Sequence, residues 1–387
     1  MLLNKAARIL VLLMLFAVLF STQSLAAPAT ADKKDSFETT AESAVLIAAD
    51  SGDLLFAKDP DKKLPMASVT KLMTLLLAVE NIEQGKSRLE DMVVASENAW
   101  GMGGSQIYLE PGEEFSYNEM LIAVAVGSAN DASVALAEHI AGSLESFVEM
   151  MNERARKLGC TGTNFANPTG LPAEGHYTTA MDLTLIMREC IKHPLFMKLS
   201  GIYEYDLRGG DFKLWSTNKL LKWYRGVDAG KTGWTTEAKY CLASTCERDN
   251  LRLIAVVLGT PEPKSHFRES IKLYNYGYAR YRAVYLEDRA KVVKTVRVEK
   301  GDQETLDLVT RDKVLLVVKK GEDRGYEGAI EAPDTVSAPV AGGQEIGHYV
   351  VTKNGNEVLR VPLLAVREVP RRGFMDQIGK SLRGVFQ

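Results

Sequence analysis

The sequence predicts an α/β protein in which a mixed domain of β-hairpins and helices precedes a smaller all-β domain. Three observations support this prediction. Short apolar runs separated by turn residues lie at both ends of residues 41–285, helical periodicity fills the middle of that segment, and strand-like runs alone follow it. With 387 residues, of which 46% are apolar and 25% charged, the chain suits two to three globular domains with a sizeable core.

The first domain is expected to open with a hairpin, because apolar residues 44–49 and 53–57 flank the turn sequence Asp50-Ser51-Gly52. A buried helix is expected from Ser68, a good N-cap residue type, to about Glu80, since leucines and valines recur there at helical spacing. Residues 240–245 and 251–258 predict a second hairpin, and the domain closes with a helix over 265–282. Further helical patterns cover residues 118–126, 131–142, 144–158 and 180–192.

The all-β domain is expected over residues 290–369. Asn354-Gly355 is a strong type I′ turn signal between its last two strands. Residues 321–343 are rich in Gly, Pro and charge, so a loop is expected there. Strand patterns cover residues 292–298, 305–309, 314–318, 349–352 and 358–364.

The N-terminus predicts export. Lys5 and Arg8 precede an unbroken apolar run of 12 residues, 9–20, and Ser24-Leu25-Ala26 places small residues at a cleavage site. An uncleaved membrane anchor is the alternative, but 12 residues fall short of the roughly 20 that a spanning helix needs. Residues 1–26 are therefore predicted to be a signal peptide, followed by a flexible polar lead over 27–40.

The C-terminal residues 370–387 predict an amphipathic helix on the membrane surface. Pro370 can begin a helix, and basic residues outnumber the single acid Asp376, which suits anionic lipid. A terminal helix docked on its own protein is the alternative. The expected apolar face consists of Phe374, Met375, Ile378, Leu382, Val385 and Phe386, opposite Asp376, Lys380 and Arg383.

Three short motifs carry candidate chemistry. Ser68 and Lys71 are three residues apart, so on a helix they share a face, and a desolvated lysine can act as a base toward a serine. Ser128-Ala129-Asn130 lies between two predicted helices, and Lys231-Thr232-Gly233 runs toward the second hairpin. Each motif alone also fits a cap, a turn or a surface lysine.

Together and in this order, the motifs match the S-x-x-K, S-x-N and K-T-G set of active-site serine penicillin-binding proteins and β-lactamases. With their flanking residues, they resemble a low-molecular-weight D-alanyl-D-alanine carboxypeptidase over about residues 40–285. The resemblance implies a serine DD-peptidase domain, with an antiparallel sheet flanked by helices, over residues 41–285. It also implies a substrate, peptidoglycan stem peptides ending in D-Ala-D-Ala, and acylation by β-lactam antibiotics.

The resemblance further implies residue roles. Ser68 is the expected nucleophile, Lys71 its base and Ser128 a proton relay, while the backbone N–H groups of Ser68 and Trp234 are the expected oxyanion hole. The residues expected to bind substrate are Asn130, Lys231, Thr232 and Gly233, with Lys231 and Thr232 suited to a terminal carboxylate and Gly233 admitting a bound peptide close to its strand.

Other readings remain open at this stage. A DD-endopeptidase of cross-links uses the same motifs. A class A β-lactamase would need a glutamate in the loop at 161–180, which contains only Glu174. A non-catalytic peptidoglycan-binding protein is a third reading. Trp215, Trp223 and Trp234 could form a wall of the substrate groove or pack under a loop.

No metal or other cofactor is expected, since the five histidines show no ligand spacing. The net charge of −3 disfavours a nucleic-acid partner. The four cysteines are expected to be mostly buried free thiols, because Cys241 and Cys246 would lie too far apart on one strand to pair. The expected location is the outer face of the cytoplasmic membrane or the cell wall.

Overall fold

The computed structural model describes residues 37–372. The predicted signal peptide, residues 27–36 of the predicted lead and residues 373–387 of the predicted tail helix lie outside these residues. The first three residues of the predicted tail are described and are not helical, because Arg371 forms a β-bridge with Gly301. The prediction that a helix begins at Pro370 is therefore wrong.

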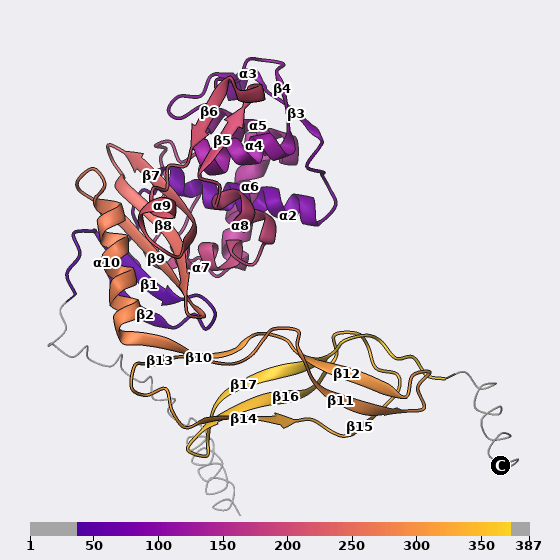
Figure 1. The fold of residues 1–387 in the computed structure, drawn as a ribbon. Coiled ribbons are helices and arrows are strands. Elements are labelled where there is room, and N and C mark those ends of the chain that lie inside the picture. Colours follow the sequence, from indigo (N-terminus) through magenta and orange to yellow (C-terminus); the bar gives the residue numbers. More distant parts are fainter. Residues whose placement is uncertain (1–36, 373–387) are drawn as a thin grey trace, which may run out of the picture. The chain divides into compact units, whose positions relative to one another are not determined.

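The first domain is built on an antiparallel five-stranded sheet in the order β2-β1-β9-β8-β7 (Figure 1). Both predicted hairpins are confirmed, as β1 with β2 and β8 with β9. The K-T-G sequence lies within β7, at the open edge of the sheet. The strands are β1 (Ser43–Ala48), β2 (Leu54–Lys58), β7 (Val227–Thr235), β8 (Lys239–Arg248) and β9 (Leu251–Thr260).

Helices cover both faces of this sheet because the side chains of each strand alternate between two buried faces. Helix α10 (Ser265–Arg280) packs against the face that carries Leu46 and Leu253, where Gly277 allows close approach. Helix α7 (Ala180–Cys190) packs on β1, β8 and β9, and the opposite-facing Val45 and Val256 join the helical core. The predicted antiparallel sheet flanked by helices is confirmed (Figure 1).

The helical part carries the remaining segments of the first domain. The predicted helices at 118–126, 131–142, 144–158 and 180–192 are confirmed, with small changes at their ends. Short elements that were not predicted are α3 (Glu97–Trp100), α8 (Pro194–Ser200), α9 (Leu220–Trp223), η3 (Arg208–Gly210) and the hairpins of β3 (Met92–Val94) with β4 (Glu114–Ser116) and β5 (Glu204–Leu207) with β6 (Phe212–Trp215). The helices are η1 (Ala67–Thr70), α2 (Lys71–Glu83), α4 (Tyr117–Ile122), the π-helical turn η2 (Ala123–Gly127), α5 (Asn130–Ala141) and α6 (Leu144–Lys157).

The C-terminal part is all-β, as predicted. The turn at Asn354-Gly355 has positive φ at both residues, 51° and 80°, as a type I′ turn requires. A six-stranded sheet has the order β14-β16-β17-β12-β11-β15, and a two-stranded sheet pairs β10 with β13. The strands are β10 (Tyr281–Glu287), β11 (Val292–Glu299), β12 (Thr305–Thr310), β13 (Val314–Lys319), β14 (Tyr326–Glu331), β15 (Thr335–Ser337), β16 (Glu345–Lys353) and β17 (Asn356–Ala365).

The loop predicted at 321–343 is wrong in part, because β14 and β15 lie within it. Both are edge strands of the six-stranded sheet and their side chains are largely exposed. Backbone pairing with β16 and β11 holds these strands in place. Because the pairing does not depend on buried side chains, their sequences show no buried apolar face. The four cysteines are buried free thiols, as expected.

Candidate active site

Ser68 and Lys71 lie where a 3₁₀ turn becomes an α-helix. The 3₁₀ helix η1 spans Ala67–Thr70 and has Met66 as its N-cap, so Ser68 lies inside the turn and not at the predicted cap. Ala67 has a φ of 47°, a left-handed conformation that is strained for a residue with a Cβ atom. The strained residue therefore directly precedes the predicted nucleophile, whose side chain is half-buried.

Lys71 is fully buried and its amino group faces three oxygen atoms. Nζ lies 3.1 Å from Ser68 Oγ, 2.6 Å from Asn130 Oδ1 and 2.6 Å from the carbonyl oxygen of Thr169. As an ammonium group, Nζ donates to all three. As a neutral amine, it donates to Asn130 and Thr169 and keeps a lone pair for the Ser68 proton.

Burial lowers the pKa of Lys71 well below its ordinary value, and the positive charge of Lys231 lowers it further, whereas Asp131 acts in the opposite direction. Desolvation dominates because an ammonium group loses its hydration in the interior. The lowered pKa favours the neutral amine, the form in which Lys71 can take the proton of Ser68.

Ser128 and Lys231 form a second hydrogen-bonded pair. Ser128 has a φ of 61° where η2 ends, and Nζ of Lys231 donates to its Oγ at 2.8 Å. Lys231 is buried in β7, and burial lowers its pKa to about 7. A buried lysine that lacks a carboxylate partner suits an anionic ligand group.

Asn130 and Asp131 connect the active-site lysine Lys71 and the start of α5 to the loop at 103–109. Asn130 accepts from Lys71 and donates from Nδ2 to the carbonyl oxygen of Gly103 at 2.6 Å. The buried carboxylate of Asp131 accepts from the backbone N–H groups of Ile107 and Leu109. The loop at 103–109 is therefore fixed against the start of α5.

On β7, Thr232 is half-buried and the side chain of Trp234 is 57% exposed. Gly233 was expected to admit a bound peptide. A Cβ atom there would lie 2.5 Å from the carbonyl oxygen of Met66 and 3.0 Å from the backbone nitrogen of Ser68. The glycine is therefore required for close packing of β7 against η1, next to the Ser68 N–H.

The loop at 161–180 supplies three residues that were not among the predicted site residues. Thr169 offers its carbonyl oxygen to Lys71, and Gly170, with a φ of 85°, contacts the carbonyl oxygen of Ala67. His176 lies 2.7 Å from Thr70 Oγ1. Glu174 is exposed. No spacing rule in the sequence gives these contacts.

The three tryptophans near the K-T-G sequence are packed only in part, with Trp223 edge-on against Phe267 and Trp234 beside Tyr240. Trp215, Trp223 and Trp234 each expose more than half of their surface. They are available to line a groove.

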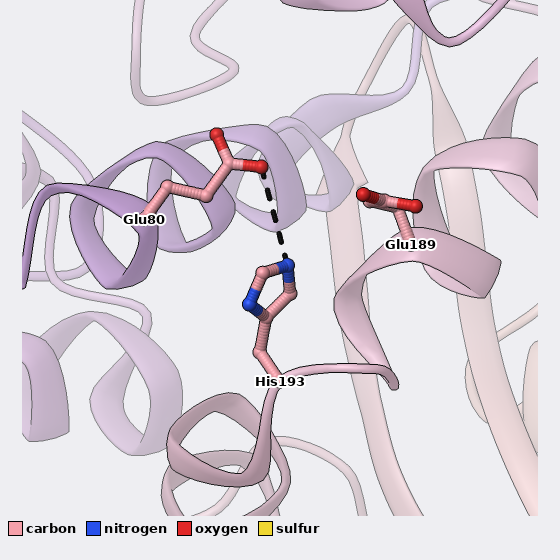
Figure 2. A group of neighbouring side chains, drawn as sticks. All are labelled: Glu80, Glu189 and His193. Carbon is pink, nitrogen blue, oxygen red and sulfur yellow. Dashed lines mark ion pairs between the residues drawn. The ribbon is translucent and has the colours of Figure 1, made fainter. Parts of the chain in front are cut away.

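A separate cluster lies away from these residues, at the other end of α2 from Lys71. Figure 2 shows Glu80, Glu189 and His193, whose possible ligand atoms lie within 4.8 Å of one another. Arg154 Nη2 donates to Glu80 at 2.5 Å and to Glu189 at 2.7 Å. Because Arg154 pairs with both carboxylates and Lys192 also pairs with Glu189, we assign this group as a structural ion-pair cluster.

Comparison with known proteins gives the same two-part division as the fold. The sequence profile of the family described as D-alanyl-D-alanine carboxypeptidase matches residues 28–262. The profile described as the C-terminal domain of penicillin-binding protein 5 matches residues 281–371.

Two relatives are similar over most of the chain and a third over about two thirds of it. The D-alanyl-D-alanine carboxypeptidase DacF of Bacillus subtilis (strain 168) is 42% identical over 365 residues, covering 92% of this chain and 94% of the relative. The structure of penicillin binding protein 5 from Haemophilus influenzae is similar with a TM-score of 0.70 and 32% identity, covering 87% of this chain and 99% of that one. A D-alanyl-D-alanine endopeptidase of Escherichia coli (strain K12) is 28% identical over 272 residues, or 68% of this chain and 85% of the relative.

The family match covers more than half of the sequence and includes all three motifs, which the fold brings together around Ser68. The chain therefore belongs to the D-alanyl-D-alanine carboxypeptidase family of serine peptidases and carries the C-terminal domain of penicillin-binding protein 5.

Proposed function

We propose that this enzyme removes the terminal D-alanine from peptidoglycan stem pentapeptides through an acyl-enzyme on Ser68, and that penicillin acylates the same serine. The observation that carries the proposal is the buried amino group of Lys71, 3.1 Å from Ser68 Oγ and with a lowered pKa. A serine hydroxyl is a weak nucleophile until a neighbouring base takes its proton.

The proposed reaction begins when Ser68 Oγ attacks the carbonyl carbon of the penultimate D-alanine and its proton passes to Lys71. The backbone N–H groups of Ser68 and Trp234 stabilise the negative charge on the carbonyl oxygen. Ser128 relays a proton to the leaving nitrogen, the C–N bond breaks, and free D-alanine departs. Water then hydrolyses the ester and restores Ser68.

The proposed substrate contacts explain a preference for a free C-terminus. Lys231 supplies a positive charge and Thr232 a hydroxyl donor for the terminal carboxylate, while Asn130 bonds the peptide backbone. Gly233 keeps the space beside the Ser68 N–H free of a side chain. Because a terminal carboxylate is the feature recognised, the reaction is that of an exopeptidase.

Three other functions fit the site or the relatives less well than a carboxypeptidase does. A DD-endopeptidase of cross-links is the nearest, since an endopeptidase relative shares the family; its match spans 272 residues, against 365 for the carboxypeptidase of B. subtilis. A class A β-lactamase would place a glutamate near the acylated serine, whereas Glu174 is exposed. A non-catalytic binding protein would not need the Ser68 and Lys71 pair.

One assay separates these functions. The purified mature protein is incubated separately with labelled penicillin, with a pentapeptide ending in D-Ala-D-Ala and with a cross-linked peptide dimer. Slow release of the penicillin label together with free D-alanine supports the carboxypeptidase. Rapid penicillin turnover without D-alanine supports a lactamase, cleavage confined to cross-linked dimers supports an endopeptidase, and no labelling supports a binding protein.

We further propose the following organisation for the exported chain: signal peptide 1–26, lead 27–40, peptidase domain 41–285, β-rich domain 290–369 and a tail that binds the outer face of the membrane. Within the described residues, no helix has the length and hydrophobicity to cross a bilayer. An amphipathic tail would attach the chain to the membrane surface, since one apolar face and a basic excess suit anionic lipid.

A chain ending at Arg372 tests the tail. Residues up to this point must remain, because Val369 is buried and Arg371 donates to the carbonyl oxygen of Ala338. The shortened enzyme should stay active on small peptides but no longer sediment with anionic liposomes. Sedimentation equal to that of the full chain, or unfolding, would show that the tail is not a membrane anchor.

A further inference from the structure

The peptide group between Ala67 and Ser68 is held from its carbonyl side by two residues outside the predicted site. Thr70 Oγ1 donates to the carbonyl oxygen of Ala67 at 2.8 Å, and the same Oγ1 lies 2.7 Å from His176 Nε2. Both side chains are buried. The contact joins η1 to a loop 106 residues away in the sequence.

The hydrogen-bond partners define the direction of this chain. His176 Nδ1 accepts from the backbone N–H of Ala166 at 3.0 Å, so the ring carries its proton on Nε2 and donates it to Thr70 Oγ1. The hydroxyl proton of Thr70 is then directed to Ala67 O. Burial and the nearby charge of Lys71 lower the pKa of His176 to about 4, so the neutral ring is the form present at neutral pH.

Because a peptide bond is planar and trans, the direction of the Ala67 carbonyl fixes the opposite direction of the Ser68 N–H. Two glycines enclose the same group. A Cβ atom on Gly170 would lie 1.9 Å from Ala67 O, and one on Gly233 would lie 3.0 Å from Ser68 N. The left-handed φ of Ala67 is a strained conformation that its surroundings must maintain.

We propose that Thr70 and His176 are positioning residues for the oxyanion site: they hold the Ala67–Ser68 peptide so that the Ser68 N–H points at the developing oxyanion. The hydrogen bond accepted by the carbonyl also polarises the peptide and strengthens its N–H as a donor. The inference rests on the proposed function, in which that N–H stabilises the tetrahedral intermediate.

The test compares Thr70→Val, which removes the hydroxyl at nearly constant volume, with Thr70→Ser, which retains it. Removing an oxyanion donor outright costs about 100- to 1,000-fold in rate, so loss of its support should cost about tenfold or more in the acylation rate constant. The Thr70→Ser enzyme should stay within about threefold of wild type. KM for a small peptide should change little in either variant, because the contact acts on the transition state.

A peptide boronic acid gives a readout that a purely structural role would not move. Ser68 Oγ adds to boron, its proton passes to Lys71, and the tetrahedral boronate places an oxygen in the oxyanion site. Boronate affinity should fall in Thr70→Val by a factor similar to the fall in acylation rate. Affinity for a non-reactive peptide amide should stay constant.

Thr74→Val is the matched control. Thr74 is a buried threonine one turn along α2, and its Oγ1 donates to the carbonyl oxygen of Pro168 in the same loop at 2.7 Å. It makes no contact with the Ala67–Ser68 peptide in the described structure. Its loss should lower the melting temperature about as much as Thr70→Val does and leave acylation within about threefold of wild type.

His176→Leu supplies a second, independent variant and a coupling measurement. It should slow acylation alone but add little in a Thr70→Val background, since both act on the same carbonyl. Additive losses, equal losses in Thr70→Val and Thr70→Ser, or Thr70→Val with wild-type acylation would each overturn the inference. Wild-type enzyme that neither binds penicillin nor releases D-alanine would instead refute the proposed function.

Discussion

Replacing Lys231 with methionine should stabilise the enzyme while damaging its activity. Lys231 is buried, and its amino group has two protein partners, Ser128 Oγ at 2.8 Å and the carbonyl oxygen of Thr232 at 3.1 Å. Burial lowers its pKa from the ordinary value of 10.5 to about 7. Methionine is of similar length and carries no charge, so it removes the cost of burying an ammonium group.

The size of the expected stability change follows from the pKa shift of Lys231. At 1.36 kcal/mol per pKa unit, burying the protonated lysine costs about 5 kcal/mol at pH 6. Against this, the variant loses two hydrogen bonds and leaves polar partners unpaired, which costs about 2 to 3 kcal/mol. The free energy of unfolding should therefore rise by about 2 kcal/mol at pH 6.

The pH dependence has a definite sign. The unfolded lysine binds a proton below about pH 10.5 and the buried one only below about pH 7, so the wild type loses stability as the pH falls between these values. At pH 9, the burial cost is only about 2 kcal/mol, which the lost hydrogen bonds cancel. The stabilisation by Lys231→Met should thus be present at pH 6 and absent at pH 9.

Urea unfolding of both proteins at pH 6 and pH 9 measures this difference. Lys86→Met, which removes an exposed lysine, is the control and should change stability little at either pH. If Lys231→Met is equally destabilising at both pH values, the buried-charge reasoning is wrong and the lysine is held by contacts that outweigh its desolvation.

The remaining predictions concern catalysis and the ion-pair cluster. Ser68→Ala should abolish penicillin labelling and D-alanine release without unfolding, and Lys71→Ala should reduce acylation by several orders of magnitude; a mild effect of the latter would indicate another base. A pentapeptide amide should be cleaved far more slowly than the free acid, measured as kcat/KM, and equal rates would contradict a carboxylate-binding role for Lys231. Arg154→Met should lower stability by about 2 to 3 kcal/mol at pH 7, since it removes the guanidinium partner of Glu80 and leaves Glu189 with Lys192 alone. Arg156→Met, at an exposed position, should have little effect.

The fold could be predicted where local sequence and burial agree. Hairpins β1–β2 and β8–β9 combine apolar strands with clear turn residues, and Asn354-Gly355 adopts the backbone that its sequence favours. Strands β14 and β15 could not be predicted, because exposed edge strands depend on backbone pairing with a neighbour and carry no apolar face.

The site could be predicted only as a set of motifs. Spacing placed Ser68 and Lys71 on one face of a helix, but it gave no sign that a carbonyl oxygen of Thr169, 98 residues away, faces the lysine. The contact of Thr70 with His176 likewise joins residues that are far apart in the sequence. A single long-range hydrogen bond leaves no periodic pattern in a sequence, so such residues emerge only when the fold brings the segments together.

The two buried lysines have different proposed roles, Lys71 as a base and Lys231 as a carboxylate-binding cation, because their surroundings differ. Lys71 has two acceptors for the hydrogens of a neutral amine and a hydroxyl for its lone pair, so it is satisfied without charge. For Lys231, burial is the cause of the low pKa, and no carboxylate of the described chain pairs with it. A substrate carboxylate would supply that missing charge and raise the pKa of Lys231 on binding. In the proposed function, the cost of burying this cation in the free enzyme would favour the binding of peptides that end in a free acid.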